Sequence, residues 1–144
     1  GAADIVISVD AALFSFSEVR IGVIPAIIAV VCLPKLGTHH GMKLILTGER
    51  FNGSRAVEMG FAHRAVPKDA LRAAVQEEVD AICLGGPIAV IECKKLVRQI
   101  PQLPADARFQ VAAEWSRRMF GTPEAAEGMA AFREKRKPSW VKQG

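Results

Sequence analysis

The sequence changes character at Pro67, and this change is what most constrains the fold. Before it, short apolar runs alternate with glycine and proline, a pattern typical of strands and short helices. From Lys68 onward, apolar residues recur with helical spacing and few interruptions. We therefore predict an α/β portion over residues 1–67 and a helical region over residues 68–144.

In the first portion, β-branched and alternating runs indicate strands, and prolines and glycines mark the ends of helices. Pro25 is suited to the first turn of a helix, where its missing N–H costs nothing. We predict strands over residues 4–9, 12–19 and 61–66, and helices over residues 26–33, 38–48 and 53–60, the last with Ser54 as its N-cap.

The second portion is expected to form four helices, over residues 69–86, 87–100, 104–121 and 122–136. The last has Thr122 as a predicted N-cap and Pro123 in its first turn. The first carries an apolar stripe, and an exposed apolar helix is a liability for a monomer. We therefore expect this region to pack against other subunits.

Composition limits the class of protein and its chemistry. Half of the 144 residues are hydrophobic, which is globular composition, and the apolar run over residues 21–33 is shorter than the roughly 20 residues of a membrane helix. Three scattered cysteines in apolar surroundings (Cys32, Cys83 and Cys93) predict reduced, inward-facing thiols of a cytoplasmic protein. His39 and His40 are adjacent and make a poor metal pair, so no metal site is expected.

One acidic residue, Glu18, stands between an aromatic and an aliphatic run in FSFSEVRIGVIPA (residues 14–26). It follows a predicted strand and precedes a turn, a position where catalytic groups often lie. A carboxylate held among apolar side chains can act as a general acid or base. The alternative, and the more common use of such a residue, is a surface carboxylate paired with Arg20 or a backbone N–H.

Basic residues gather in FREKRKPSWVK (residues 132–142), and the net charge of the chain is +4. One interpretation is a solvated helix end, where cations suit the helix dipole. Phe132 lies one helical turn before Lys135, and an aromatic ring beside cations also suits an adenine ring and its phosphates. Single-stranded nucleic acid fits less well, because one patch is not a continuous groove.

Together these stretches resemble the enoyl-CoA hydratase/isomerase family, the crotonase superfamily. The similarity is carried by ADIVISVDAALFSFSEVRIGVIP, LPKLGTHHGMKLILTGERFNGSRAVEMGFAHRAVP and EGMAAFREKRKPSW, in order and with compatible spacing. TGE followed by A-x-x-x-G is specific as a combination. The resemblance implies an α/β fold, namely the second half of a crotonase-like ββα spiral followed by a C-terminal helical oligomerisation region.

The resemblance also implies roles for residues. Glu18 matches one of two glutamates of the family's hydratases, which protonates the α-carbon as water adds across the enoyl double bond. In the family's isomerases the matching residue moves a proton along the acyl chain. Ala26 matches the position whose backbone N–H helps to hold the catalytic water. Phe132 and Lys135 match positions that contact the CoA adenine and phosphate, commonly in a neighbouring subunit's site.

The chain departs from the family pattern in two ways. Ile27 and Ile28 stand where a glycine-rich G-x-G-G usually follows I-P, so the acyl pocket or the water position is expected to differ. In the family, the other glutamate and both oxyanion-hole donors lie upstream of the Asp-led strand, and Gly1 begins too late to include them. Because loss of one such donor typically costs about 10²–10³ in rate, we expect this segment alone to be inactive and an N-terminal half to accompany it.

The resemblance therefore implies an enoyl-CoA hydratase-type lyase of fatty acid metabolism that acts on an acyl-CoA thioester as a homotrimer or a dimer of trimers. Coenzyme A is part of the substrate, and no separate cofactor, nucleic acid or membrane partner is expected. Two alternatives stay open. One is an enoyl-CoA double-bond isomerase, which needs only one well-placed carboxylate, and the other is a non-catalytic assembly homologue.

Overall fold

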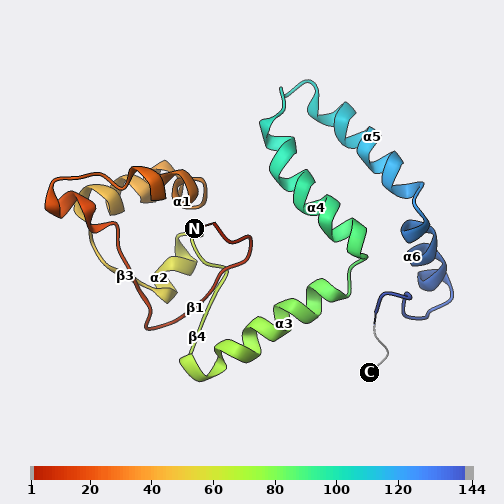
Figure 1. Cartoon of the computed structure of the whole chain (residues 1–144), viewed down its shortest axis with the longest axis horizontal. Helices are drawn as coiled ribbons and strands as arrows, with labels where there is room; N and C mark the ends of the chain where they lie inside the picture. Colours follow the sequence, from red (N-terminus) through yellow and green to blue (C-terminus); the bar gives the residue numbers. More distant parts are fainter. Residues whose placement is uncertain (1, 142–144) are drawn as a thin grey trace. The chain divides into compact units, whose positions relative to one another are not determined.

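A computed structural model describes residues 2–141 of the chain, which form two compact units (Figure 1). The division falls between Glu77 and Glu78, within helix α3 (Leu71–Cys83). The N-terminal unit contains β1 (Ile7–Val9), β2 (Leu13–Phe14), the 3-10 turn η1 (Ser17–Ile21), α1 (Ala26–Thr47), β3 (Phe51–Asn52), α2 (Gly53–Glu58), β4 (Arg64–Val66) and η2 (Lys68–Ala70).

Two short strand pairs organise the N-terminal unit. β1 pairs in parallel with β4, with Val9 opposite Val66, and β2 pairs antiparallel with β3, with Phe14 opposite Phe51. Parallel strands require a long crossover, and α1 and α2 lie within it. His63 extends the parallel pair, because its N–H donates to the Val6 carbonyl (2.8 Å) and its Nδ1 accepts the Val6 N–H (3.1 Å).

The strand predicted over residues 12–19 is wrong in its second half. Only Leu13 and Phe14 pair as a strand, and Ser17–Ile21 form the 3-10 turn η1. Gly22 ends this turn in the left-handed conformation (φ 79°), which favours glycine, and the Val23 N–H donates back to the Glu18 carbonyl (3.2 Å). The strand predicted over residues 4–9 is shorter than expected, because its partner β4 has only three residues.

The two helices predicted over residues 26–33 and 38–48 are joined as α1, which breaks at Gly37, where the backbone is not helical (φ 65°, ψ 172°). The chain therefore remains helical through Pro34 and beyond the predicted end at Leu33. The N-cap of α2 is Asn52 rather than Ser54, since the Asn52 side chain accepts the Arg55 N–H (2.9 Å).

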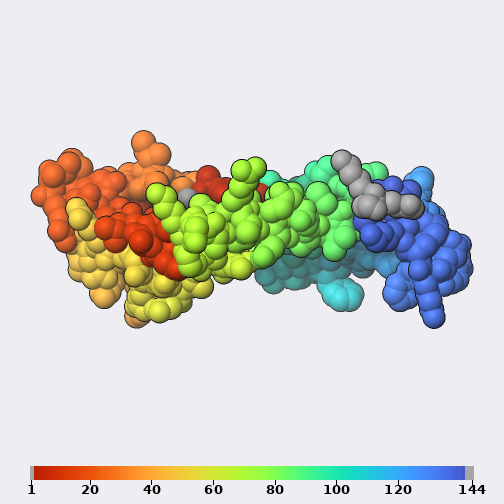
Figure 2. Space-filling view, turned by 90° about the horizontal axis from the view of Figure 1, so that it is seen from below, coloured from red at the N-terminus to blue at the C-terminus, as the bar shows by residue number. Residues whose placement is uncertain are grey.

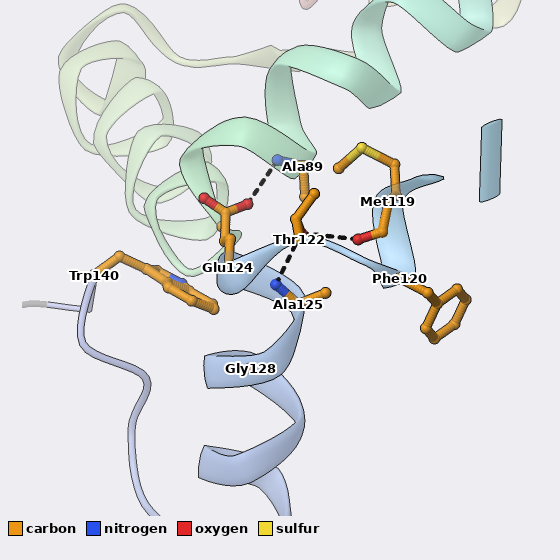
Figure 3. Close-up of a pocket in the computed structure, with 9 residues that line it drawn as sticks. Ala89, Met119, Phe120, Thr122, Glu124, Ala125, Gly128 and Trp140 are labelled. Atoms are coloured by element: carbon orange, nitrogen blue, oxygen red, sulfur yellow. Dashed lines mark hydrogen bonds between the residues drawn. The ribbon is translucent and has the colours of Figure 1, made fainter. Parts of the chain in front are cut away.

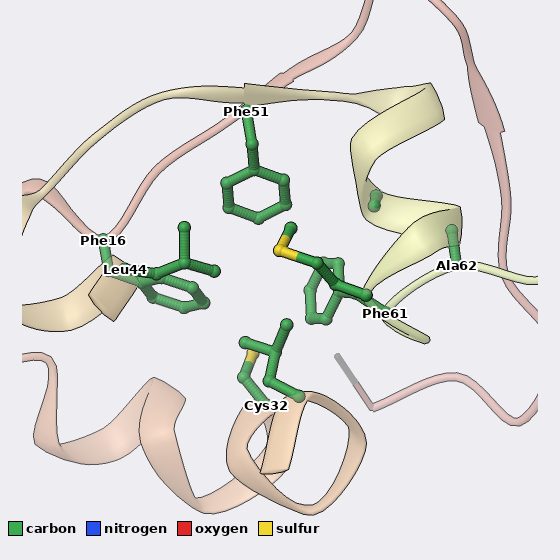
Figure 4. Packing of buried hydrophobic residues seen from close by; sticks show 9 residues of the cluster. Phe16, Cys32, Leu44, Phe51, Phe61 and Ala62 are labelled. Atoms are coloured by element: carbon green, nitrogen blue, oxygen red, sulfur yellow. The ribbon is translucent and has the colours of Figure 1, made fainter. Parts of the chain in front are cut away.

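An aromatic core holds the N-terminal unit together (Figure 4). Phe51 stacks on Phe14 and Phe16, with ring centroids 5.4 and 6.3 Å apart, and meets Phe61 edge to face at 6.0 Å. Cys32, Leu36 and Leu44 of α1 close this core from the helix side. Burial of these rings fixes the positions of β2, β3 and the segment that leads into η1.

The C-terminal unit is helical, with α4 (Pro87–Gln99), η3 (Ile100–Gln102), α5 (Arg108–Phe120) and α6 (Pro123–Arg133) after the end of α3. The buried Trp115 of α5 donates from Nε1 to Glu92 of α4 (2.9 Å). Hydrogen bonds from Lys95 and Trp115 lower the pKa of Glu92. Thr122 is the N-cap of α6, as predicted, and accepts the Ala125 N–H (3.1 Å).

Several apolar side chains face solvent in this chain. On α3 the residues Val75, Val79 and Ile82 of the predicted stripe are exposed, and so are Ile24, Ile27 and Val30 around the start of α1. The α1 segment, drawn in orange, lies at the surface in Figure 2.

The expectation of three inward-facing cysteines is wrong for two of them, because Cys83 and Cys93 are exposed and only Cys32 is buried. No described helix is long and apolar enough to cross a membrane.

Candidate functional site

Glu18 lines a cavity of ≈ 370 Å³ in the N-terminal unit. The walls come from β2, η1, the start of α1 and the residues around β3 and α2. They are formed by Val6, Leu13, Phe14, Ser15, Phe16, Ile28, Cys32, Phe51 and Phe61. Apart from Glu18 and Ser15, every side chain in this lining is apolar or a thiol. A cavity of this kind suits the apolar part of a small molecule, with one ionisable group to act on it.

The Glu18 carboxylate has one oxygen, Oε2, that is buried and has no hydrogen-bond partner. It is the one such side-chain oxygen or nitrogen found within residues 2–141. Arg20, one of the two partners that the surface interpretation offers for Glu18, donates from Nε to the Thr47 carbonyl (3.3 Å). A buried oxygen left without a partner is costly, which makes it a candidate for a group that acts on a ligand.

The start of α1 lies just after the Glu18 segment and offers free backbone donors. Ala26 is the first residue of this helix, and no side chain caps it. The Ala29 N–H donates to the Pro25 carbonyl (2.9 Å), so the N–H groups of the three preceding residues have no acceptor within the helix. This includes the Ala26 N–H, for which the family resemblance predicts a water-holding role.

Only one of the two unusual isoleucines enters the site. Ile28 lines the Glu18 cavity, so its bulk reduces the space beside the carboxylate. Ile27 points elsewhere, because its side chain is 90% exposed. The departure from the glycine-rich pattern therefore affects the cavity through Ile28 and the outer surface through Ile27.

Phe132 and Lys135 lie at the end of α6, in the C-terminal unit. Phe132 is 88% exposed, and its carbonyl accepts the Lys135 N–H (3.2 Å). Lys135 has a left-handed backbone (φ 55°), an unusual conformation for a residue with a side chain. The helix therefore ends before Lys135, contrary to the predicted helical-turn spacing, and both residues are exposed at the turn that ends α6.

The loop after this turn is held by an ion-pair network around Glu127. Both of its oxygens accept from Arg136 (2.7 and 2.9 Å), and Oε1 also accepts the Ser139 N–H (2.9 Å). The hydrogen bonds from Arg136 and Ser139 lower the pKa of Glu127 to about 2. Arg136 is therefore committed to a structural contact, whereas the basic-tail interpretation treated it as part of the free positive charge.

A second pocket, of ≈ 210 Å³, lies in the C-terminal unit between α4 and α6 (Figure 3). Glu124 in its wall accepts the Ile88 and Ala89 N–H groups with its two oxygens (2.9 and 2.8 Å), so it caps α4. Trp140 covers the pocket from the loop after α6 and donates from Nε1 to the Leu84 carbonyl (3.2 Å). Because both oxygens of Glu124 serve the helix, we place the candidate site at Glu18 instead.

Sequence reasoning missed the cavity walls opposite Glu18. Phe51 and Phe61 come from segments more than 30 residues away, and nothing in the local pattern around Glu18 points to them. The described residues contain no cluster of three or more His, Cys, Asp or Glu side chains that could hold a metal ion. The polar or ionisable side chains in the lining of this cavity are those of Glu18, Ser15 and Cys32.

Comparison with known proteins matches residues 1–143 to the family described as enoyl-CoA hydratase/isomerase. A carnitinyl-CoA dehydratase of Proteus mirabilis is 31% identical over 96% of this chain and 55% of its own length. Two solved structures are similar in fold. An enoyl-CoA hydratase/isomerase from Marinobacter aquaeolei has a TM-score of 0.91 at 29% identity, over 97% of this chain and 53% of that one. An enoyl-CoA hydratase from Shewanella pealeana has a TM-score of 0.87 at 32% identity, over 96% and 52%.

These matches confirm the resemblance to the crotonase superfamily and its α/β fold. The chain spans about half the length of the curated relatives that it matches. The matches do not test the roles of individual residues, so those of Glu18, Ala26, Phe132 and Lys135 stay predictions.

Proposed function

This chain belongs to the enoyl-CoA hydratase/isomerase family, and we propose that the intact protein is a lyase that adds water across the double bond of a 2-enoyl-CoA thioester. The observation that carries the proposal is Glu18 itself, which lines a mostly apolar cavity and has one buried oxygen without a hydrogen-bond partner. Hydration and dehydration are the two directions of one reaction, so the name of the Proteus mirabilis relative is compatible with this class.

In the proposed reaction Glu18 acts as a general acid. The oxygen of water bonds to C3 of the acyl chain, the electrons of the double bond move toward the thioester oxygen, and the protonated Glu18 carboxyl delivers its proton to C2. The proton lost by water goes to a second base outside the described residues. The thioester oxygen, which gains negative charge, is stabilised by backbone N–H donors that we also place outside this segment.

The start of α1 supports a position for the attacking water. The Ala26 N–H has no acceptor within the helix, and α1 is the next helix in the chain after the η1 turn that contains Glu18. We assign to it the hydrogen bond that holds the water oxygen near C3. Ile28, which lines the same cavity, would limit the size of the acyl group that fits beside this water.

We assign recognition of the CoA adenine and phosphate to Phe132 and Lys135, which are adjacent and exposed. We further propose that the protein is a cytoplasmic homotrimer or dimer of trimers that includes an N-terminal half, and that this turn serves a neighbouring subunit's site. The exposed Phe109, Phe120 and Met129 of α5 and α6 support contact with other chains.

A double-bond isomerase is the second candidate, and one observation favours it. Glu18 is the one ionisable carboxylate in the cavity lining, and moving a proton along the acyl chain needs a single such group. Product analysis separates the two functions, because hydration consumes water and yields a 3-hydroxyacyl thioester, whereas isomerisation keeps the composition of the substrate and shifts the double bond.

The test uses the intact protein with 2-butenoyl-CoA and with a 3-enoyl-CoA, and identifies the products by mass and chromatography. We expect hydration of the first, and a loss of kcat of about 10²–10⁴ in Glu18→Gln. Glu58→Gln is the matched control, since Glu58 is exposed and paired with Arg55. A protein that turns over neither thioester would be a non-catalytic homologue instead, and hydration at the wild-type rate in Glu18→Gln would show that another group carries the proton.

A further inference from the structure

The Glu18 segment is anchored to the end of α1 on both sides of the carboxylate. Ser15, three residues before Glu18, donates from Oγ to the Gly48 carbonyl (3.1 Å). Arg20, two residues after it, donates from Nε to the Thr47 carbonyl (3.3 Å). Glu18 itself lies in a 3-10 turn of five residues, whose hydrogen bonds have poorer geometry than those of an α-helix.

The Thr47 and Gly48 carbonyls can accept from Arg20 and Ser15 because they lie at the end of a helix. Thr47 is the last residue of α1, so its carbonyl is one of those that lack a partner within the helix. The C-terminal end of a helix carries partial negative charge, which attracts the Arg20 guanidinium. Gly48 is the C-cap of α1 and its N–H donates to the Leu44 carbonyl (3.0 Å). Its own carbonyl lies beyond the last helical hydrogen bond and accepts from Ser15.

Gly48 also allows the close approach of the two segments. It adopts a left-handed backbone (φ 59°). A Cβ atom at this position would lie 3.0 Å from Arg20 Nε, 3.3 Å from Arg20 Cγ and 3.4 Å from the Phe16 carbonyl oxygen. A side chain at residue 48 would therefore press on the residues that flank Glu18. In this fold, the Thr-Gly of the TGE motif therefore contacts the residues on both sides of Glu18.

We propose that Ser15 and Arg20 are positioning residues for the reaction, held by the Thr47–Gly48 turn, and that they keep the Glu18 carboxylate in its cavity. The inference rests on the proposed function, because it assigns Glu18 the proton transfer. Neither side chain needs to touch the substrate. Their effect passes through the backbone of η1, and misplacement of a catalytic group by about 1 Å can cost about 10²-fold in rate.

The test measures kcat and KM of the intact protein with 2-butenoyl-CoA for Ser15→Ala and Arg20→Gln, each alone and combined with Glu18→Gln. We expect kcat to fall about 10- to 100-fold in the single variants, with KM changed less than about twofold. In the Glu18→Gln background neither substitution should lower kcat further, because their effect acts through Glu18. Arg20→Lys, which keeps a cation near the helix end, should recover part of the rate.

Arg50→Gln is the matched control, because Arg50 is exposed and lies just beyond the same turn, and kcat should stay unchanged. Wild-type kcat in Arg20→Gln and Ser15→Ala, or an equal further loss in the Glu18→Gln background, overturns the positioning role. Wild-type kcat in Glu18→Gln overturns the proposed function and this inference with it. If thermal unfolding shows that Arg20→Gln does not fold, Ser15→Ala and Arg20→Lys decide the question by the same comparison.

Discussion

Replacing Phe51 by alanine should destabilise the N-terminal unit by about 3 kcal/mol or slightly more. Phe51 is 5% exposed and contacts three other phenylalanine rings. Burial of such a side chain contributes about 1.5–3 kcal/mol, and each aromatic contact adds about 0.5–1.5 kcal/mol. Measured Phe→Ala losses in protein cores are about 3–5 kcal/mol. Because Phe51 also lines the Glu18 cavity, solvent can fill part of the lost volume, so we expect the lower end of that range.

The assay is urea denaturation followed by far-UV circular dichroism. Tryptophan fluorescence would not report on this region, because Trp115 and Trp140 both lie in the C-terminal unit. Phe109→Ala is the control, since Phe109 is 86% exposed and such surface changes usually stay within about 0.5 kcal/mol. A loss below about 1 kcal/mol in Phe51→Ala, or equal losses in both variants, would refute the assignment of Phe51 to the core.

Three further results are expected. Asn52→Ala should cost about 1 kcal/mol in urea denaturation because it removes the N-cap of α2, whereas Ser54→Ala should be near neutral; the reverse order would restore Ser54 as the cap. Since contacts with Arg136 and Ser139 lower the pKa of Glu127 from 4.5 to about 2, its contribution to stability is present above pH 4.5 and is lost as the pH falls toward 2. The melting temperatures of wild type and Glu127→Gln should therefore converge over this range, and a constant difference would contradict the ion pair. Lys135→Ala should raise KM for the CoA thioester about tenfold with little change in kcat, as for loss of one charge-assisted hydrogen bond, and an unchanged KM would remove Lys135 from the site.

The helical spacing of apolar residues after Lys68 made the helical part of the fold predictable. α4 begins and ends close to the predicted residues, and α6 begins where Thr122 and Pro123 predict it, because proline and the Thr122 cap mark these ends in the sequence. α5 begins at Arg108, later than the predicted start at residue 104, and α6 ends at Arg133, before the predicted residue 136. Periodicity also predicts the apolar stripe of α3, of which Ala74 is buried and Val79 is exposed. Periodicity shows which side of a helix is apolar, but it does not show what covers that side.

The strands and the turn at Glu18 were harder to predict because they depend on distant partners. β1 pairs with β4 more than 50 residues later, and the length of β4 sets how much of residues 4–9 is strand. The alternation in FSFSE fits a strand, but the chain leaves β2 after Phe14 and turns, ending at the left-handed Gly22. Local alternation cannot distinguish a paired strand from an extended segment that leads into a turn.

The candidate site was found in part for the same reason. A lone carboxylate before a G-x-I-P turn identified Glu18, and the structure shows that Glu18 lines a mostly apolar cavity and that its Oε2 is buried without a partner. The anchoring of its segment to Thr47 and Gly48 was not predicted, because Arg20 was considered only as a partner of Glu18 itself. A neighbouring opposite charge suggests an ion pair, but backbone carbonyls at a helix end compete for the same guanidinium.

The most direct test of the role of Glu18 is the entry of solvent deuterium at C2 of the product. When the intact protein hydrates 2-butenoyl-CoA in deuterium oxide, the deuteron delivered to C2 should come from the Glu18 carboxyl. We predict that Glu18→Gln lowers the rate of this C–D bond formation by about 10²–10⁴, while KM and the melting temperature stay close to those of wild type. Deuterium entry at the wild-type rate in Glu18→Gln would show that another group carries the proton.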